Sequence, residues 1–62
     1  MERIYFEGGD RDGTTLDVNE NLEVDTLLFD GSGGVASPRG RYVRTNERIF
    51  FEGADRVIWC LA

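Results

Sequence analysis

Histidine is absent from this 62-residue chain, and cysteine occurs once, as Cys60. Without histidine, a tetrahedral Cys/His zinc site is excluded, and so is a nucleophile activated by a histidine base. A single cysteine cannot form an internal disulfide. Because Cys60 lies inside an apolar segment, we expect its thiol to be buried and inert. We therefore expect no metal, no cofactor and no enzymatic activity.

Lysine is missing too, and all seven basic residues are arginines, a usage typical of a GC-rich genome that bears on source and not on function. The chain also lacks an apolar run of 18 residues and the basic, apolar and small-residue pattern of a signal peptide. We therefore expect a soluble, cytoplasmic protein with no membrane contact. A lone thiol fits that reducing compartment.

Sixty-two residues make one small β domain, 1–62. A chain this short buries only about 60% of its unfolded surface, so its stability is marginal without additional support. Disulfides, metals and self-association are the usual supports of such domains. Because the composition excludes an internal disulfide and a Cys/His zinc site, we expect a homo-oligomer, most simply a homodimer.

Charge is divided unevenly along this acidic protein, whose net charge is −5. Residues 1–30 contain nine acids and two arginines, a net charge of −7, whereas residues 31–62 contain five arginines and three acids, a net charge of +2. The acidic half argues against binding to nucleic acid or to anionic lipid.

Two near-identical decapeptides are the most informative feature of the sequence: residues 2–11 read ERIYFEGGDR and residues 47–56 read ERIFFEGADR. In each, apolar and polar residues alternate and then meet glycine, the pattern of a strand that enters a tight turn. The duplication predicts a pseudo-symmetric β structure with a strand-turn repeat.

Alternation and turn residues elsewhere predict further strands, separated by turns and by a long glycine-rich loop over 30–40. The expected strands are 3–7, 14–18, 22–29, 41–45, 48–52 and 56–61. We predict an all-β fold, a small antiparallel meander of five or six strands forming a barrel or half-barrel. The last strand is apolar on both faces, as expected for a central, doubly covered strand. The predicted core is Ile4, Phe6, Leu16, Val18, Leu22, Val24, Leu28, Val43, Ile49, Phe51, Val57, Trp59 and Leu61.

Opposite this core face, each decapeptide presents an arginine, an aromatic residue and a glutamate. The two sets are Arg3, Tyr5 and Glu7, and Arg48, Phe50 and Glu52. An exposed aromatic residue between opposite charges is typical of an interface. The alternative is that Tyr5 and Phe50 pair across neighbouring strands and shield each other. Further apolar residues off the core face favour the interface: Leu27, Phe29, Ile58 and Cys60.

Two other patterns indicate chemistry only weakly. Asp10, Asp12 and Gly13 match a fragment of a calcium loop, but the remaining oxygen ligands are missing, and Asp and Gly are common in ordinary turns. Glu7 and Glu52 could act as a carboxylate pair in acid–base catalysis, but nothing in the sequence supplies a pocket to shift their pKa values.

The basic strip 39–48 offers an alternative function. Arg41 and Arg44 flank Tyr42, and arginines interleaved with an aromatic residue can follow phosphates and stack a base of single-stranded nucleic acid. The other interpretation is that this strip, which also includes Arg39 and Arg48, balances the acidic half within the chain or across a dimer.

Three segments together resemble a group of short actinobacterial proteins of unknown function: the pair Gly8-Gly9, the element Gly40-Arg41-Tyr42-Val43-Arg44-Thr45, and the late strand containing Trp59. No proline follows the glycine pair here, unlike in that group. The resemblance implies a small accessory protein and assigns no catalytic residue.

We therefore predict a small non-enzymatic module that binds another protein, itself included, through its aromatic and charged β surface. The expected contact residues are Arg3, Tyr5, Glu7, Arg41, Tyr42, Arg44, Arg48, Phe50 and Glu52. Besides the nucleic-acid alternative, a phage-encoded acidic inhibitor could use Glu20, Glu23 and Asp25 against a basic groove.

Overall fold

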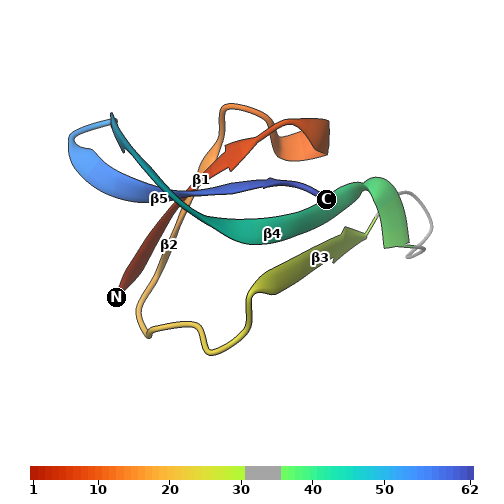
Figure 1. The fold of residues 1–62 in the computed structure, drawn as a ribbon, viewed down its shortest axis with the longest axis horizontal. Helices are drawn as coiled ribbons and strands as arrows, with labels where there is room; N and C mark the ends of the chain where they lie inside the picture. Colours follow the sequence, from red (N-terminus) through yellow and green to blue (C-terminus); the bar gives the residue numbers. More distant parts are fainter. Residues whose placement is uncertain (31–35) are drawn as a thin grey trace.

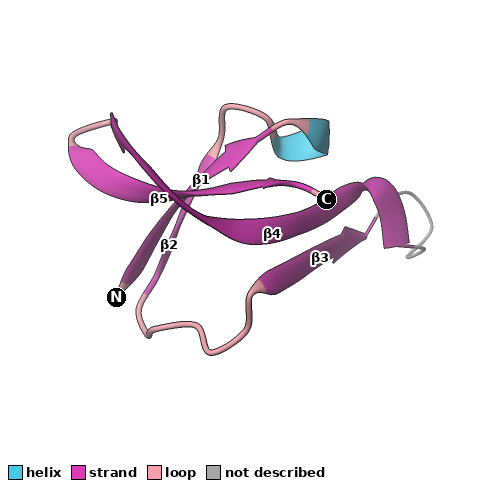
Figure 2. Cartoon of the chain, viewed as in Figure 1, coloured by secondary structure: helices cyan, strands magenta, loops and turns pink. Residues whose placement is uncertain are grey.

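A computed structural model describes residues 1–30 and 36–62 of the chain. Nearly all of this part is strand or connecting turn, and its only helical segment is one short 3-10 turn (Figure 2). The elements are β1 (Glu2–Glu7), η1 (Gly9–Arg11), β2 (Thr15–Val18), β3 (Thr26–Asp30), β4 (Ala36–Phe51) and β5 (Ala54–Leu61). The predicted all-β class is confirmed.

The five strands form one mixed sheet in the order β2-β1-β5-β4-β3, curved into a half-barrel as predicted. Three of the four strand pairings are antiparallel, and the central pairing of β1 with β5 is parallel, from Ile4 opposite Val57 to Glu7 opposite Cys60. The fold is thus a hairpin, β1–β2, joined to a meander, β3–β4–β5, whereas a simple meander has no parallel pair. In Figure 1, β1 and β2 cross the direction of β4 and β5 steeply, as the strong twist of a small sheet requires.

β4 unites two strands that the sequence had predicted separately, 41–45 and 48–52. Between the pairs Arg44–Trp59 and Arg48–Val57, β4 has two more residues than β5, so the predicted turn at Asn46 is a bulge. The glycine-rich loop predicted over 30–40 is also shorter, because β4 begins at Ala36. The part of that loop at 31–35 lies outside the described residues. The third predicted strand begins later than expected, at Thr26.

The β4–β5 turn consists of Glu52 and Gly53, not of the predicted Gly53, Ala54 and Asp55. Glu52 has φ 50° and Gly53 has φ 76°. Positive φ at both central residues defines a type I′ turn, whose twist matches that of the flanking strands. Ala54 and Asp55 therefore already belong to β5.

The main core lies on one face of the sheet, where Ile4, Phe6, Tyr42 and Trp59 are fully buried. The Phe6 and Tyr42 rings meet edge to face, with 4.8 Å between their centroids. The burial of Ile4, Phe6 and Trp59 confirms that these three residues belong to the core, as predicted. Six partly buried residues pack against this core: Val18, Leu22, Leu27, Phe29, Val57 and Leu61.

Three predicted core residues are instead exposed: Leu16, Val24 and Leu28. Leu28 is 67% exposed because β3 pairs with β4 so that Leu27 lies opposite Tyr42, on the core face. In a strand, when the residues of one face pack against the core, the alternate residues point outward. Val24 lies before β3 begins, in the connection from β2.

A second, smaller cluster covers the opposite face of the sheet. There the Tyr5 and Phe51 rings contact edge to face at 5.1 Å, and Ile58 and Ala54 are buried. Residues on both faces of β5 are therefore buried, as predicted for a doubly covered central strand. Phe51 and the other predicted core residues of β4, Val43 and Ile49, are half-buried and face this side, because they pair with Ala54, Cys60 and Arg56.

The structure does not confirm the decapeptides as a structural repeat. The first forms β1 and enters η1, whereas the second spans the β4–β5 hairpin. Phe6 pairs with Trp59 and faces the main core, but its counterpart Phe51 pairs with Ala54 and faces the other side. The same local sequence therefore occupies different positions and faces of one sheet.

Candidate protein-binding surface

The β4–β5 hairpin extends past the rest of the sheet, and β3 lies toward the other end of β4 (Figure 1). Pairing of β3 with β4 ends at Val43, followed by one hydrogen bond from the Arg44 amide to the Asp25 carbonyl, 2.9 Å. Beyond the bulge, no strand within 1–30 and 36–62 pairs with the outer edge of β4. This edge is open.

Phe50 lies on this open segment and is 75% exposed, the highest value for a large apolar residue in the described chain. Arg48, two residues before it, forms an exposed ion pair with Asp55 at 3.1 Å. Glu52 at the turn is exposed as well. The second predicted set of contact residues thus lies together at the tip of the molecule.

Behind this tip lies an open groove of about 450 Å³ on the face of Arg48. It is lined by Met1, Glu2, Arg3, Asn21, Leu22, Arg44, Arg48, Asp55 and Val57. The lining residues include three arginines and two acids, in a protein of net charge −5. Arg3, Arg44 and Arg48, which the sequence placed on separate strands, are brought together here.

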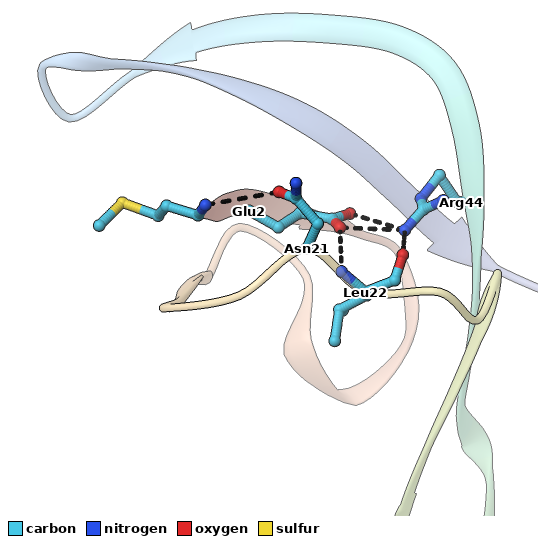
Figure 3. A network of polar contacts seen from close by, with 5 residues as sticks. Glu2, Asn21, Leu22 and Arg44 are labelled. Atoms are coloured by element: carbon cyan, nitrogen blue, oxygen red, sulfur yellow. Dashed lines mark hydrogen bonds and ion pairs between the residues drawn. The ribbon is translucent and has the colours of Figure 1, made fainter.

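Figure 3 shows a network of polar contacts among five residues that line the groove. An Arg44 Nη donates to both Glu2 carboxylate oxygens, at 3.0 and 3.1 Å, and to the Leu22 carbonyl at 2.8 Å. The Leu22 amide donates to Glu2 at 3.0 Å, and the amino group of Met1 donates to Asn21. Through these contacts Arg44 joins β4 to β1 and to the connection before β3.

Arg44 also stacks over Trp59, with its guanidinium carbon 5.0 Å from the ring centroid. Neither the buried Nε of Arg44 nor the indole N–H of Trp59 has a hydrogen-bond partner among the described residues. Cation–π attraction between the two side chains offsets part of the cost of leaving these donors unpaired. Arg44 is therefore a structural residue as well as a lining residue.

Arg3 differs from the other two arginines of the groove. Its Nε contacts the thioether of Met1 at 3.5 Å, a weak acceptor. No carboxylate within 1–30 and 36–62 forms an ion pair with it.

Tyr42 is fully buried, so its predicted role as a contact residue is wrong. Its hydroxyl accepts the Arg11 amide at 2.7 Å and donates to the Gly8 carbonyl at 2.6 Å, which fastens the turn after β1 to β4. Gly9 makes this approach possible: it has φ 64°, and a Cβ there would lie 2.7 Å from the Tyr42 hydroxyl.

The alternative to an interface, that Tyr5 pairs with Phe50, is wrong, because the two rings face opposite sides of the sheet. Tyr5 lies opposite Ile58 and packs against Phe51, whereas Phe50 lies opposite Asp55. Tyr5 is half-buried and so contributes little free surface. Glu7 and Arg41 are exposed and lie apart from the groove.

The acidic residues of the first half have different surroundings. Glu20, Glu23 and Asp25 are exposed in the connection from β2 to β3. Asp12 instead accepts the Gly8 amide at 2.7 Å, so it stabilises its own turn. Among the described residues, no three His, Cys, Asp or Glu side chains are placed to hold a metal ion together.

Sequence reasoning missed Arg56 and Glu2. Arg56 is 5% exposed; its Nε donates to the Phe51 carbonyl at 3.0 Å and an Nη to Asp17 at 2.5 Å. The available signal was an arginine at the start of the most apolar predicted strand, where a buried charge is retained only if it is paired. No sequence signal indicated Glu2, because its partner Arg44 is 42 residues away.

Among the described residues, no helix is long and apolar enough to span a membrane. No protein-family model matches the chain, and neither a curated protein nor a solved structure shows significant similarity to it.

Proposed function

We propose that this protein is a non-enzymatic, self-associating protein-binding module of the cytoplasm, and that it binds through the tip of the β4–β5 hairpin. The observation that carries the proposal is the exposure of Phe50 on a hairpin whose outer edge is open. Exposed aromatic residues flanked by charges are enriched at interfaces. An open strand edge is a template for pairing with another chain.

The described contacts weaken the nucleic-acid alternative. Tyr42, which would stack a base, is buried, and Arg44, which would bind phosphate, is held by Glu2. Only Arg41 of that trio is exposed. A binder of single strands needs both stacking platforms and free cations, so a protein partner agrees better with these positions.

The acidic-inhibitor alternative is supported by one observation, the exposure of Glu20, Glu23 and Asp25 in one connection. Such a function would act through electrostatic attraction to a basic groove. Against it, the nearby Arg3, Arg44 and Arg48 reduce the negative potential of that region. We therefore propose the tip of the β4–β5 hairpin, and not this acidic connection, as the binding surface.

Replacement of Phe50 by glutamate tests the proposal. The wild-type protein should show a mass that rises with concentration in sedimentation equilibrium, and Phe50→Glu should weaken association at least tenfold because it places a charge at an apolar contact. Circular dichroism should show the fold intact, since the side chain is already exposed.

Leu28→Glu is the matched control, because Leu28 is about as exposed but lies on β3, away from the hairpin. It should associate like the wild type. A wild-type mass that stays monomeric at every concentration, or equal association of Phe50→Glu and wild type, would contradict the proposed function.

A further inference from the structure

The open edge of β4 presents unpaired peptide groups next to Phe50. In a two-residue hairpin, the residues on either side of the turn, here Phe51 and Ala54, form a hydrogen-bonded pair. Such pairs alternate with non-hydrogen-bonded pairs along an antiparallel ladder. By this alternation, the backbone N–H and C=O groups of Ile49 also bond to β5. Those of Arg48 and Phe50 point away from β5, toward the open edge.

The sequence along this edge is complementary to itself. Arg48-Ile49-Phe50-Phe51-Glu52 has opposite charges at its ends and an aromatic residue at its centre. If two copies pair antiparallel about a two-fold axis at Phe50, Arg48 of each copy lies opposite Glu52 of the other. The two Phe50 rings then face each other. Opposite-charge and aromatic cross-strand pairs are both stabilising.

The other free edges of the sheet lack this complementarity. The β3 edge, Thr26–Asp30, contains no basic residue, so two copies paired along it would have no opposite charges to place against each other. On β2, Thr15–Val18, the only charged residue is Asp17, so two copies paired along that edge would have no opposite charges either. Of the edges in the described chain, only that of β4 is matched to a second copy by charge.

Glu52 supplies an independent observation. Its φ of 50° is the left-handed conformation, which at this position of a type I′ turn favours Asn, Asp or Gly. When a residue type that disfavours this conformation nevertheless occupies it, we infer that its side chain is required there. Glu52 makes no hydrogen bond or ion pair with the described residues, so nothing in that part of the chain accounts for a glutamate here.

We infer that two copies of this chain join through the outer edges of β4, antiparallel and centred on Phe50, to form one continuous sheet. The inference rests on the proposed function and names its partner and its register. A closed two-fold contact uses the same patch on both copies, so it stops at the dimer. The paired segment is short, and we expect a weak dimer that dissociates on dilution.

Charge reversal tests this register. Arg48→Glu and Glu52→Arg should each weaken the dimer at least fivefold, because each sets like charges opposite each other at both ends of the paired segment. The double variant Arg48→Glu/Glu52→Arg restores both opposite pairs and should recover dimerisation to within about twofold of the wild type. Sedimentation equilibrium at low salt gives the dissociation constants.

Glu7→Arg is the matched control, since Glu7 is the counterpart of Glu52 in the first decapeptide, is exposed, and lies outside the paired edge. It should dimerise like the wild type. If the double variant is as weak as the single ones while Phe50→Glu still abolishes association, the register is wrong and the proposed function stands. If no variant or wild type associates, both fail.

Glu52→Asn separates turn chemistry from contact chemistry. Asparagine suits the left-handed conformation, so the melting temperature measured at a dilution where the protein is monomeric should rise. The dimer should nevertheless weaken, because the charge opposite Arg48 is lost. A rise in melting temperature with unchanged dimerisation would show that Glu52 serves the turn alone, and would overturn the proposed contact.

Discussion

At the residue scale, the two tyrosines show how one side-chain type serves different purposes. Tyr42 is buried and its hydroxyl bonds two backbone groups of the turn after β1. Tyr5 is half-buried, and its hydroxyl makes no hydrogen bond with the described residues, so its contribution is the ring contact with Phe51. The stability of the fold should therefore depend on only one of these hydroxyls.

Tyr42→Phe should lower the free energy of unfolding by about 1–3 kcal/mol, because it leaves the Arg11 amide and the Gly8 carbonyl without their partner. Tyr5→Phe, the matched control, should change it by less than about 0.5 kcal/mol. Urea denaturation of both variants provides the measurement. Equal losses would mean that the Tyr42 hydroxyl does not hold the turn.

At the element scale, the connection from β2 to β3 has a single backbone bond to a described strand, from the Arg44 amide to the Asp25 carbonyl. Its position therefore depends mainly on side chains of distant strands. Glu2 of β1 receives the Leu22 amide, and Arg44 of β4 donates to the Leu22 carbonyl. With both backbone groups of Leu22 satisfied, its side chain can pack against the main core. This connection also forms one wall of the groove.

Glu2→Ala should therefore cost about 2 kcal/mol of stability, since it leaves the half-buried Arg44 and the Leu22 amide unpaired. Amide exchange should accelerate within 20–25 more than elsewhere. Asp55→Ala removes an ion pair that is exposed on both sides, and it should cost less than about 0.5 kcal/mol. Both free energies of unfolding should be measured at a protein concentration where the chain is monomeric. Similar losses for the two variants would contradict this role of Glu2.

At the scale of the whole molecule, a small half-barrel leaves Phe50 and an open edge at the end farthest from β3. A chain of 62 residues is only marginally stabilised by its own core. Association that covers this edge would stabilise the folded state by mass action. Stability and self-association are therefore linked in the proposal.

The melting temperature of the wild type should rise with protein concentration, by a few degrees over a hundredfold range that spans the dissociation constant. Phe50→Glu should melt at one temperature across the same range, because it no longer dimerises. Differential scanning calorimetry at several concentrations distinguishes these outcomes. A wild-type melting temperature independent of concentration would argue against the link.

Local pattern was sufficient for the all-β class, the strands at either end of the chain, and the burial of Ile4, Phe6 and Trp59, because alternation and turn residues act over a few neighbouring positions. The same information could not show which face of β3 turns inward. Nor could it show that Tyr42 reaches the turn after β1, because that contact spans 34 residues.

The sequence by itself determined that this chain has no histidine-based chemistry and no internal disulfide, and that it forms strands. The tertiary structure decided which strands are neighbours, and with them the parallel β1–β5 pair, the Glu2–Arg44 network and the isolation of Phe50 from Tyr5. The physical reason is that register and pairing are set by contacts between distant segments. Two almost identical decapeptides therefore have different neighbours and different exposed faces.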